Sequence, residues 1–329
     1  MKNVLITGGA GYIGSHITEL LIKKKLNIVI IDNLSSGYKR LINKKAKFYN
    51  LDINNYIKLK NIIISNDIDS VIHLAANLDV NESQLKPKKY YRNNVLGTFN
   101  LIKACKKANI KNFIFSSTAA VYKDKIFKVS ELSPVKPKSI YGKTKLKAEN
   151  LIKKHFKKHN INYVILRYFN IVGSSNSKKI GQINKYNLLF KNLSIAVLKK
   201  KPMINIYGNN YNTKDGTSIR DFIHVSDISN IHFLALSKIN KVKKSFTLNC
   251  GYGQGRSVLE VVKLFEKISK KKIKINFESR RKADLEQIIA NVSKLKKLFK
   301  WKPKFNNLPL MIKSSIQWQR KIKNINVKY

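Results

Sequence analysis

The 329-residue sequence is poor in cysteine, in acidic residues and in long apolar runs. Its two cysteines, Cys105 and Cys250, stand far apart inside apolar segments, which excludes a disulfide framework and a cysteine-based metal site. No stretch of about 18 residues is both apolar and uncharged, and the first strand-like segment begins directly at Val4. We therefore expect neither a membrane helix nor an export signal, but a protein of the reducing cytoplasm.

The scarcity of acidic residues gives the sequence a strong positive charge. Only 18 aspartates and glutamates oppose 66 lysines and arginines, for a formal net charge of +48. Such a charge attracts nucleic acids. The lysines are nevertheless spread over nearly every expected helix, and no nucleic-acid-binding motif accompanies them. We interpret them as exposed helix faces and expect no specific nucleic-acid partner.

The first half of the sequence alternates short β-rich segments with longer helical ones. Strands are expected at about 4–7, 28–32, 70–75, 112–116 and 162–167, and helices at 15–25, 55–65, 91–108 and 141–158. This alternation indicates βαβ units, in which helices cover both faces of a parallel sheet.

After residue 170 the alternation breaks. A polar stretch at 174–186 is followed by a mixture of helices, expected at 188–200, 226–237, 258–269 and 293–299, and strands, expected at 203–207, 246–249 and 274–277. We therefore predict one domain over 1–170 and a second over 171–329, with the segment of about 217–250 returning to the first.

A glycine-rich loop follows the first expected strand. Gly8, Gly11 and Gly14 are spaced G-x-x-G-x-x-G and lead into an amphipathic helix. In this context the glycines allow a tight turn and the close approach of backbone N–H groups to a pyrophosphate. The fold class predicted is α/β: a doubly wound, parallel-sheet Rossmann domain with a smaller α/β C-terminal substrate domain.

Strand ends supply further candidate residues for cofactor binding. Asp32 ends the second strand, where a carboxylate accepts hydrogen bonds from both ribose hydroxyls and repels a 2′-phosphate. This favours NAD over NADP. Asp52 and Ile53 are candidates for the adenine edge, and Ala75 and Ala76 for the pyrophosphate channel.

Three residues have the types and spacing of a proton-transfer site. Thr118 follows the strand at 112–116, and Tyr141 and Lys145 stand one helical turn apart. A tyrosine has an ordinary pKa of about 10, but a lysine ammonium and a cationic nicotinamide ring both favour its phenolate. Tyr141 is therefore the predicted acid/base.

Taken together, these motifs resemble the extended short-chain dehydrogenase/reductase family, and within it the UDP-glucose (UDP-galactose) 4-epimerases. The similarity covers nearly the whole chain, and its most diagnostic part is the segment 206–225 of the second domain. The resemblance implies that Tyr141 is the acid/base, that Lys145 binds the nicotinamide ribose and the tyrosine, and that Thr118 binds the sugar hydroxyl. For NAD, it implies contacts from Gly8, Gly11, Tyr12, Ile13, Gly14, Asp32, Asn33, Ser36, Asp52, Ile53, Leu74, Ala75, Ala76, Asn93, Ser116, Tyr141, Lys145 and Phe169. For the UDP-sugar, it implies Thr118, Tyr141, Asn170, Tyr207, Arg220, Arg281 and Asp284.

The activity implied by the resemblance is reversible 4-epimerisation of UDP-glucose and UDP-galactose through a 4-keto intermediate, with tightly bound NAD as the transient hydride acceptor. UDP-N-acetylhexosamines and UDP-pentoses are alternative substrates. A branched residue, Ile288, occupies a position where size helps to decide whether an N-acetyl group fits, which disfavours the N-acetylated sugars. The helices at 91–108 and 141–158 resemble those that pair epimerase subunits, so we expect a homodimer.

Other classes of function are opposed by named residues. Related dehydratases carry an acidic pair after the catalytic threonine, whereas Ala119 and Ala120 follow Thr118 and can move no proton. A non-catalytic dinucleotide sensor would not be expected to retain both Tyr141 and Lys145. No metal site is expected, because the histidine pair at 155 and 159 lacks an accompanying carboxylate motif.

Overall fold

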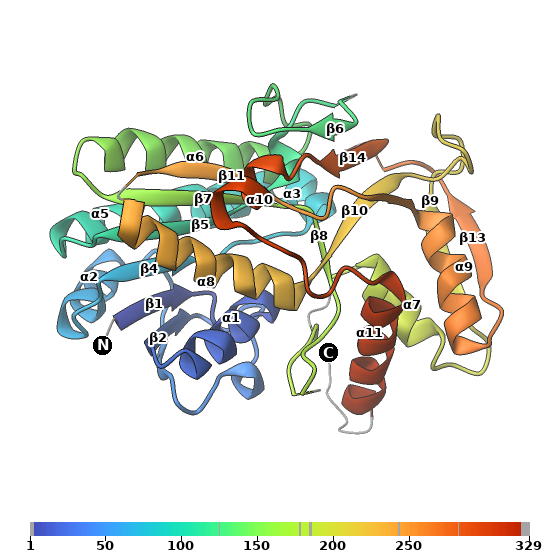
Figure 1. Ribbon diagram of the computed structural model, residues 1–329, viewed down its shortest axis with the longest axis horizontal. Coiled ribbons are helices and arrows are strands. Elements are labelled where there is room, and N and C mark those ends of the chain that lie inside the picture. Colours follow the sequence, from blue (N-terminus) through green and yellow to red (C-terminus); the bar gives the residue numbers. More distant parts are fainter. Residues whose placement is uncertain are drawn as a thin grey trace.

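The computed structural model describes residues 3–323 except 125, 178, 184, 185, 243 and 282. At its centre lies a parallel seven-stranded sheet (Figure 1). The strand order is β11-β7-β5-β4-β1-β2-β3, with β1 (Asn3–Thr7), β2 (Asn27–Asp32), β3 (Lys47–Asn50), β4 (Ser70–His73), β5 (Asn112–Thr118), β7 (Asn162–Tyr168) and β11 (Phe246–Cys250). The order of strand addition reverses between β1 and β4, which opens a crevice at their carboxyl ends.

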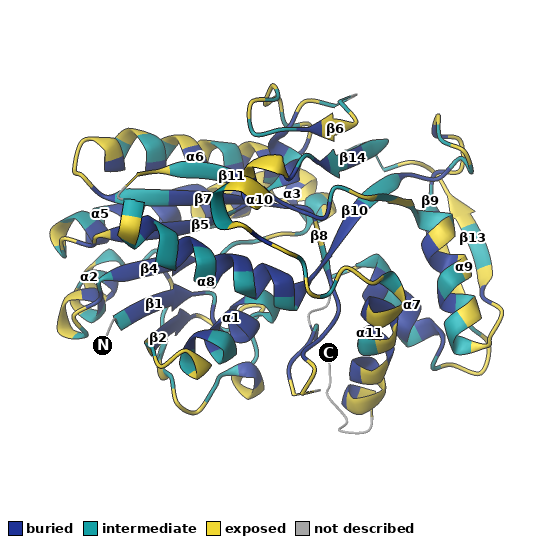
Figure 2. Cartoon of the chain, in the orientation of Figure 1, coloured by how far each residue is buried: buried dark blue, intermediate teal, exposed yellow. Residues whose placement is uncertain are grey.

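Helices bury both faces of this sheet. Helices α1 (Tyr12–Lys23) and α8 (Val225–Val242) cover one face, and α2 (Tyr56–Ser65), α5 (Thr98–Lys107) and α6 (Ile140–Lys157) cover the other. Val4 and Ile6 belong to the hydrophobic cluster of the first face and Leu5 to that of the second, because successive side chains of a strand point to opposite sides. The inner strands β1 and β4 are accordingly almost wholly buried (Figure 2), whereas the edge strand β3 has only intermediate and exposed residues. The predicted doubly wound α/β fold is confirmed.

The remaining strands form two small sheets beside the large one. The first contains β12 (Gly255–Ser257), β10 (Ile219–His224), β14 (Gln287–Ala290) and β6 (Lys128–Val129), with β8 (Asn170–Val172) also paired to β10; the second pairs β9 (Met203–Tyr207) with β13 (Lys274–Glu278). Helices α7 (Leu189–Ala196), α9 (Val258–Ser269) and α11 (Leu308–Lys323) accompany them, whereas α10 (Ser293–Phe299) contacts β11 and α8 of the large sheet's layer.

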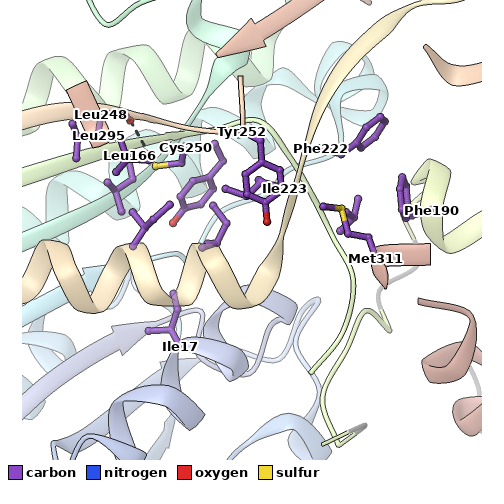
Figure 3. Packing of buried hydrophobic residues seen from close by; sticks show 14 of the residues in the cluster. Ile17, Leu166, Phe190, Phe222, Ile223, Leu248, Cys250, Tyr252, Leu295 and Met311 are labelled. Carbon is purple, nitrogen blue, oxygen red and sulfur yellow. Dashed lines mark hydrogen bonds between the residues drawn. The ribbon is translucent and has the colours of Figure 1, made fainter. Parts of the chain in front are cut away.

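One hydrophobic cluster is continuous between the large sheet and this second region. It includes Leu166 on β7, Phe190 on α7, Phe222 on β10 and Met311 on α11, which Figure 3 shows along one packed layer. The two parts of the chain therefore share a core. None of the helices in the described residues combines the length and the hydrophobicity of a membrane span.

The structure differs from the sequence-based expectation in several elements. The helix expected at 91–108 is three segments: α4 (Pro87–Tyr91), a π-helix, η2 (Arg92–Gly97), and α5. A short helix, α3 (Val80–Leu85), and two 3₁₀ turns, η1 (Lys39–Leu41) and η3 (Ala119–Val121), complete the described elements. Helix α11 was not expected, because its buried Ser315 and Gln319 interrupt the apolar pattern.

Helix α11 is anchored to the polar segment that the sequence left without structure. The indole N–H of Trp318 donates to the carbonyl of Gln182 at 3.0 Å, and the side chain of Gln319 donates to the same carbonyl at 2.9 Å. A Cβ on Gly181 would lie 2.6 Å from the indole ring, so the ring packs directly on the backbone. Trp318 therefore fixes the segment around Gln182.

Replacing Trp318 with alanine should lower the free energy of unfolding by about 3–5 kcal/mol, because it leaves a cavity in the core. Urea denaturation followed by circular dichroism measures the change. Gln317→Ala, at an exposed position of the same helix, is the matched control and should change stability by less than about 0.5 kcal/mol. Equal stability of the two variants would contradict this account of α11.

Candidate active site

The turn between β1 and α1 can be built only with glycine at two positions. Gly8 has a φ of +76°, and a Cβ there would lie 2.7 Å from the backbone nitrogen of Ala75. A Cβ on Gly14 would lie 2.3 Å from the carbonyl oxygen of Gly8. No side chain caps the N-terminus of α1, so it is open to an anionic ligand. The turn therefore has the features of a pyrophosphate cradle.

Asp32 closes the neighbouring end of β2. Its carboxylate accepts hydrogen bonds from the backbone N–H groups of Ala10 (3.0 Å) and Leu34 (2.8 Å), and burial raises its pKa. A carboxylate has about four acceptor positions, so capacity remains for ribose hydroxyls. Gly37 is required beside it, because a Cβ there would lie 2.8 Å from an Asp32 oxygen.

A cleft of about 370 Å³ runs from this turn across the ends of β1, β4 and β5. All but one of the residues predicted to bind NAD line it, together with Thr118 and Asn170. The exception is Asp52, which instead accepts a hydrogen bond from Asn33 at 3.2 Å and so supports a lining residue. The lining also includes residues that the sequence analysis did not assign to a site, among them Asn77, Tyr168, Gln182, Tyr186, Phe190 and Phe222.

The three predicted proton-transfer residues meet at one side of the cleft. The Thr118 side chain lies close enough to Tyr141 to lower the pKa of the phenol, and Lys145 follows one turn along α6. The Lys145 side chain is 2% exposed, and its Nζ lies 4.2 Å from the centroid of the Phe115 ring. The helix start that presents Tyr141 is capped by Ser139, whose Oγ accepts from the N–H of Gly142.

Burial dominates the acid–base properties of this site. It raises the pKa of Tyr141 to about 12, although the hydrogen bond from Thr118 opposes the shift, and it lowers the pKa of Lys145 to about 7. Burial therefore favours the neutral phenol of Tyr141 and the neutral amine of Lys145. Additional positive charge close to the phenol is needed before Tyr141 ionises near neutral pH.

A chain of buried hydrogen bonds lies beneath the cleft. His73 on β4 contacts Thr7 through Nδ1 (2.7 Å) and Thr98 through Nε2 (2.8 Å). Because the Thr98 hydroxyl donates to the carbonyl of Asn94 at 2.7 Å, it accepts from His73 Nε2–H, and Nδ1 then accepts from Thr7. Burial lowers the pKa of His73 to about 3, which fits a neutral ring with one defined tautomer.

The π-helix η2 connects this chain to the catalytic helix. It directs Asn93 into the cleft and Asn94 into the core. The Asn94 side chain accepts from the N–H of Asn77 (2.8 Å) and donates to its carbonyl (3.0 Å) and to Thr144 Oγ1 (3.2 Å). Thr144 in turn donates to the carbonyl of Tyr141 at 2.8 Å. The Asn94 side chain thus connects Asn77, in the lining of the cleft, to Thr144 on the helix of Tyr141.

The remaining predicted substrate residues form a second group that does not line this cleft. The guanidinium of Arg281 lies 3.7 Å from the centroid of the Tyr207 ring, and Arg220 Nη1 donates to the carbonyl of Ile219 at 2.9 Å. Asp284 adjoins this group and acts electrostatically on Arg220. Arg281 Nε and the hydroxyl of Tyr211, which the sequence analysis did not single out, are buried without a hydrogen-bond partner among the described residues.

Ile288 is a core residue rather than part of the cleft wall. It is 5% exposed and packs in a hydrophobic cluster with Ala119, Tyr122 and Phe169. Ile288 packs against Phe169, which lines the cleft, so its effect on the site is indirect.

Residues 4–251 match the family model for the NAD dependent epimerase/dehydratase family. The chain belongs to this family. It is 37% identical to the UDP-glucose 4-epimerase of Azospirillum brasilense over 321 residues, which are 97% of this chain and 92% of that protein.

Solved structures of epimerases have the same fold over nearly all of the chain. The UDP-glucose 4-epimerase from Stenotrophomonas maltophila, solved with bound NAD and formylated UDP-arabinopyranose, superposes with a TM-score of 0.94 at 32% identity and covers 99% of this chain and 100% of its own. The UDP-Glc/GlcNAc 4-epimerase from Campylobacter jejuni has a TM-score of 0.84 at 38% identity, with coverages of 98% and 100%.

The cradle geometry predicts the effect of a single methyl group. Gly14→Ala should yield a folded protein that has lost most of its bound NAD, because the added Cβ collides with the Gly8 carbonyl. Nucleotide released by acid denaturation and quantified by chromatography measures occupancy, and circular dichroism checks the fold. Gly11→Ala, whose Cβ would meet its nearest neighbour at 3.2 Å, should lose less. Full occupancy in Gly14→Ala would contradict the assignment of this turn.

Proposed function

We propose that this chain catalyses the reversible 4-epimerisation of UDP-glucose and UDP-galactose with NAD as its resident cofactor. The observation that carries the proposal is the contact of Thr118 with Tyr141, one turn from Lys145, beside a glycine-lined dinucleotide cleft. Membership of the NAD dependent epimerase/dehydratase family, and the names of relatives that match over nearly full length, support it.

The residues of the cleft fit NAD. Gly8 and Gly14 leave room for a pyrophosphate at the N-terminus of α1, and Asp32 offers a carboxylate to the adenosine ribose. NAD held by these residues would supply a reversible hydride acceptor for carbon 4 of the sugar. Its cationic nicotinamide ring also provides the positive charge that the buried Tyr141 requires.

Tyr141 acts as the general base and then as the general acid. Its phenolate removes the proton of the sugar 4-hydroxyl, and its phenol returns that proton when the 4-keto group is reduced. Thr118, whose side chain lies near Tyr141, orients the same sugar oxygen. Lys145 stabilises the phenolate in its ammonium form, which is partly populated near neutral pH because the pKa of the lysine is about 7. Ala119 and Ala120 offer no acid for loss of water.

The second group of residues supplies the anchor for UDP. Arg281 and Arg220 carry planar guanidinium groups suited to diphosphate oxygens, and the unpartnered Arg281 Nε and Tyr211 hydroxyl are ready donors. A 4-keto sugar held mainly through its UDP can turn over between the two hydride transfers. The hydride then returns to the opposite face of the sugar, and the configuration at carbon 4 is inverted.

The deciding experiment is conversion of UDP-galactose to UDP-glucose by the purified protein without added reductant. Tyr141→Phe should reduce the turnover by about 10²–10⁴-fold, because it removes the proton-transfer group. Tyr163→Phe is the matched control, because Tyr163 stands at the start of β7, away from the strand ends that face the cleft. This variant should retain wild-type turnover. Absence of conversion by wild-type protein that contains NAD would refute the proposal.

UDP-N-acetylglucosamine is a second candidate substrate. The Campylobacter jejuni relative is named for both UDP-Glc and UDP-GlcNAc, and Ile288 lies in the core instead of the cleft wall. Both substrates should be assayed side by side. A kcat/KM for the N-acetylated sugar above that for UDP-galactose would reassign the main substrate without changing the chemistry.

We also propose that the chain forms a homodimer through α6 and the neighbouring η2 and α4. An apolar groove lies there, and two large hydrophobic side chains of its lining are exposed: Tyr91 and Leu96. Its described lining contains four cations and no carboxylate: Lys88, Arg92, Lys143 and Lys147. Two copies therefore bring like charges together, and association should strengthen as salt screens them.

Sedimentation velocity at low and high salt tests this interface. Wild-type protein should shift toward the dimer as salt increases, and Leu96→Lys should remain monomeric because it adds a buried charge. Leu132→Lys, at a position 95% exposed and away from the groove, should behave as wild type. A dimer that survives Leu96→Lys would place the interface elsewhere.

A further inference from the structure

A buried carboxylate lies directly behind the catalytic lysine. Glu149 is fully buried and stands one helical turn beyond Lys145 on α6. It accepts a hydrogen bond from Ser117 Oγ at 2.5 Å and a bidentate pair from Arg167, with Nε at 3.0 Å and Nη2 at 2.7 Å. Lys153, at 3.6 Å, is its solvent-side partner. The proton-transfer steps above use none of these contacts.

The partners of Glu149 lie on the two strands that carry the site. Ser117 and Arg167 are register neighbours at the carboxyl ends of β5 and β7, and Ser117 immediately precedes Thr118. One carboxylate thus joins the helix that bears Tyr141 and Lys145 to the strand that bears Thr118. No other acidic residue among the described ones makes such a connection.

The guanidinium of Arg167 is fixed on its other side. It lies over the ring of Tyr122, with 4.8 Å between Cζ and the centroid, and the Tyr122 hydroxyl donates to Asn249 at 2.6 Å. Buried ion pairs contribute little net stability compared with apolar residues of similar volume, because both charges lose their hydration. What this pair supplies is a defined geometry between α6, β5 and β7.

We propose that Glu149 is a positioning residue for epimerisation: through Ser117 it sets the hydroxyl of Thr118 against Tyr141, and from one turn away it holds the charge of Lys145 in place. This proposal rests on the epimerase function proposed above. It assigns Glu149 no contact with substrate or cofactor.

The charge of Glu149 also acts on Lys145. Burial lowers the pKa of the lysine, and the nearby carboxylate opposes that shift. The other titratable or charged groups around this position are Tyr141 on the same helix, the neutral His73 on β4, and Arg167 and Tyr168 on β7. Removing the carboxylate should lower the pKa of Lys145 further. The ammonium form is lost as pH rises through that pKa. The alkaline limb of the pH profile of kcat should therefore move to lower pH.

Two variants separate positioning from folding. Ser117→Ala removes only the hydroxyl and keeps the ion pair, whereas Glu149→Gln keeps the shape and removes the charge. Each should lower kcat for UDP-galactose by about 10–100-fold, as expected for a small misplacement of reacting groups, with KM changed less than about twofold. Glu149→Gln alone should also shift the alkaline limb of the kcat profile to lower pH.

Matched controls carry the same chemical changes elsewhere. Ser229→Ala removes a buried hydroxyl on α8. Glu260→Gln removes the charge of Glu260 on α9 and with it an exposed ion pair to Arg256. Both should retain the kcat and pH profile of the wild type. The double variant Glu149→Gln/Arg167→Gln removes both charges and thus avoids an unpaired buried cation. Its kcat should stay low.

The outcomes distinguish this proposal from the function on which it rests. A wild-type protein that retains NAD and converts no UDP-sugar defeats the proposed function itself. Active wild type with unchanged kcat in Ser117→Ala, or recovery of kcat in the double variant, overturns the role of Glu149 and leaves the function intact. If Glu149→Gln does not fold, the kcat values of Ser117→Ala and of the double variant still test the positioning role of Glu149.

Discussion

The structure depends on a backbone approach that leaves no space for a side chain. Gly14 meets the carbonyl of Gly8, and Gly8 meets the backbone of Ala75, so β1, α1 and the end of β4 converge within van der Waals distance. This convergence places a helix N-terminus at the point where the strand order reverses. The cleft lies beside this convergence, and both Gly8 and Gly14 line it.

The burial of Tyr141 and Lys145 has an electrostatic cost. Burial alone makes Tyr141 a weaker acid and Lys145 a weaker base, and both changes disfavour the charged pair needed for proton transfer. The site is therefore complementary to a cationic ring and a polarised sugar hydroxyl rather than to water. Around it, neutral polar side chains such as His73 and Asn94 have all their hydrogen-bonding partners, which fixes the geometry without adding further charge.

The sequence predicted the large sheet and the cleft well because both have local signals. Gly8, Asp32 and Tyr141 each follow a regular strand or begin a regular helix, so their position in the sequence determines their position in space. Other features depend on contacts between distant segments. The π-helix that separates Asn93 from Asn94, the burial of Ile288, and the polar buried residues of α11 cannot be read from periodicity. Gln182 and Tyr186 reach the cleft from an irregular segment that has no pattern at all.

The continuous hydrophobic cluster between the large sheet and α7, β10 and α11 has a mechanical consequence. Two lobes that share one core cannot rotate apart about a hinge without exposing Phe190, Phe222 and Met311 to water. A shared core favours local over domain-wide motion, and the segment that Trp318 fixes at Gln182 is one of those that line the cleft. A dinucleotide in the cleft would then lie between parts of one shared core, with Gln182 and Tyr186 of this segment among the residues that line its site.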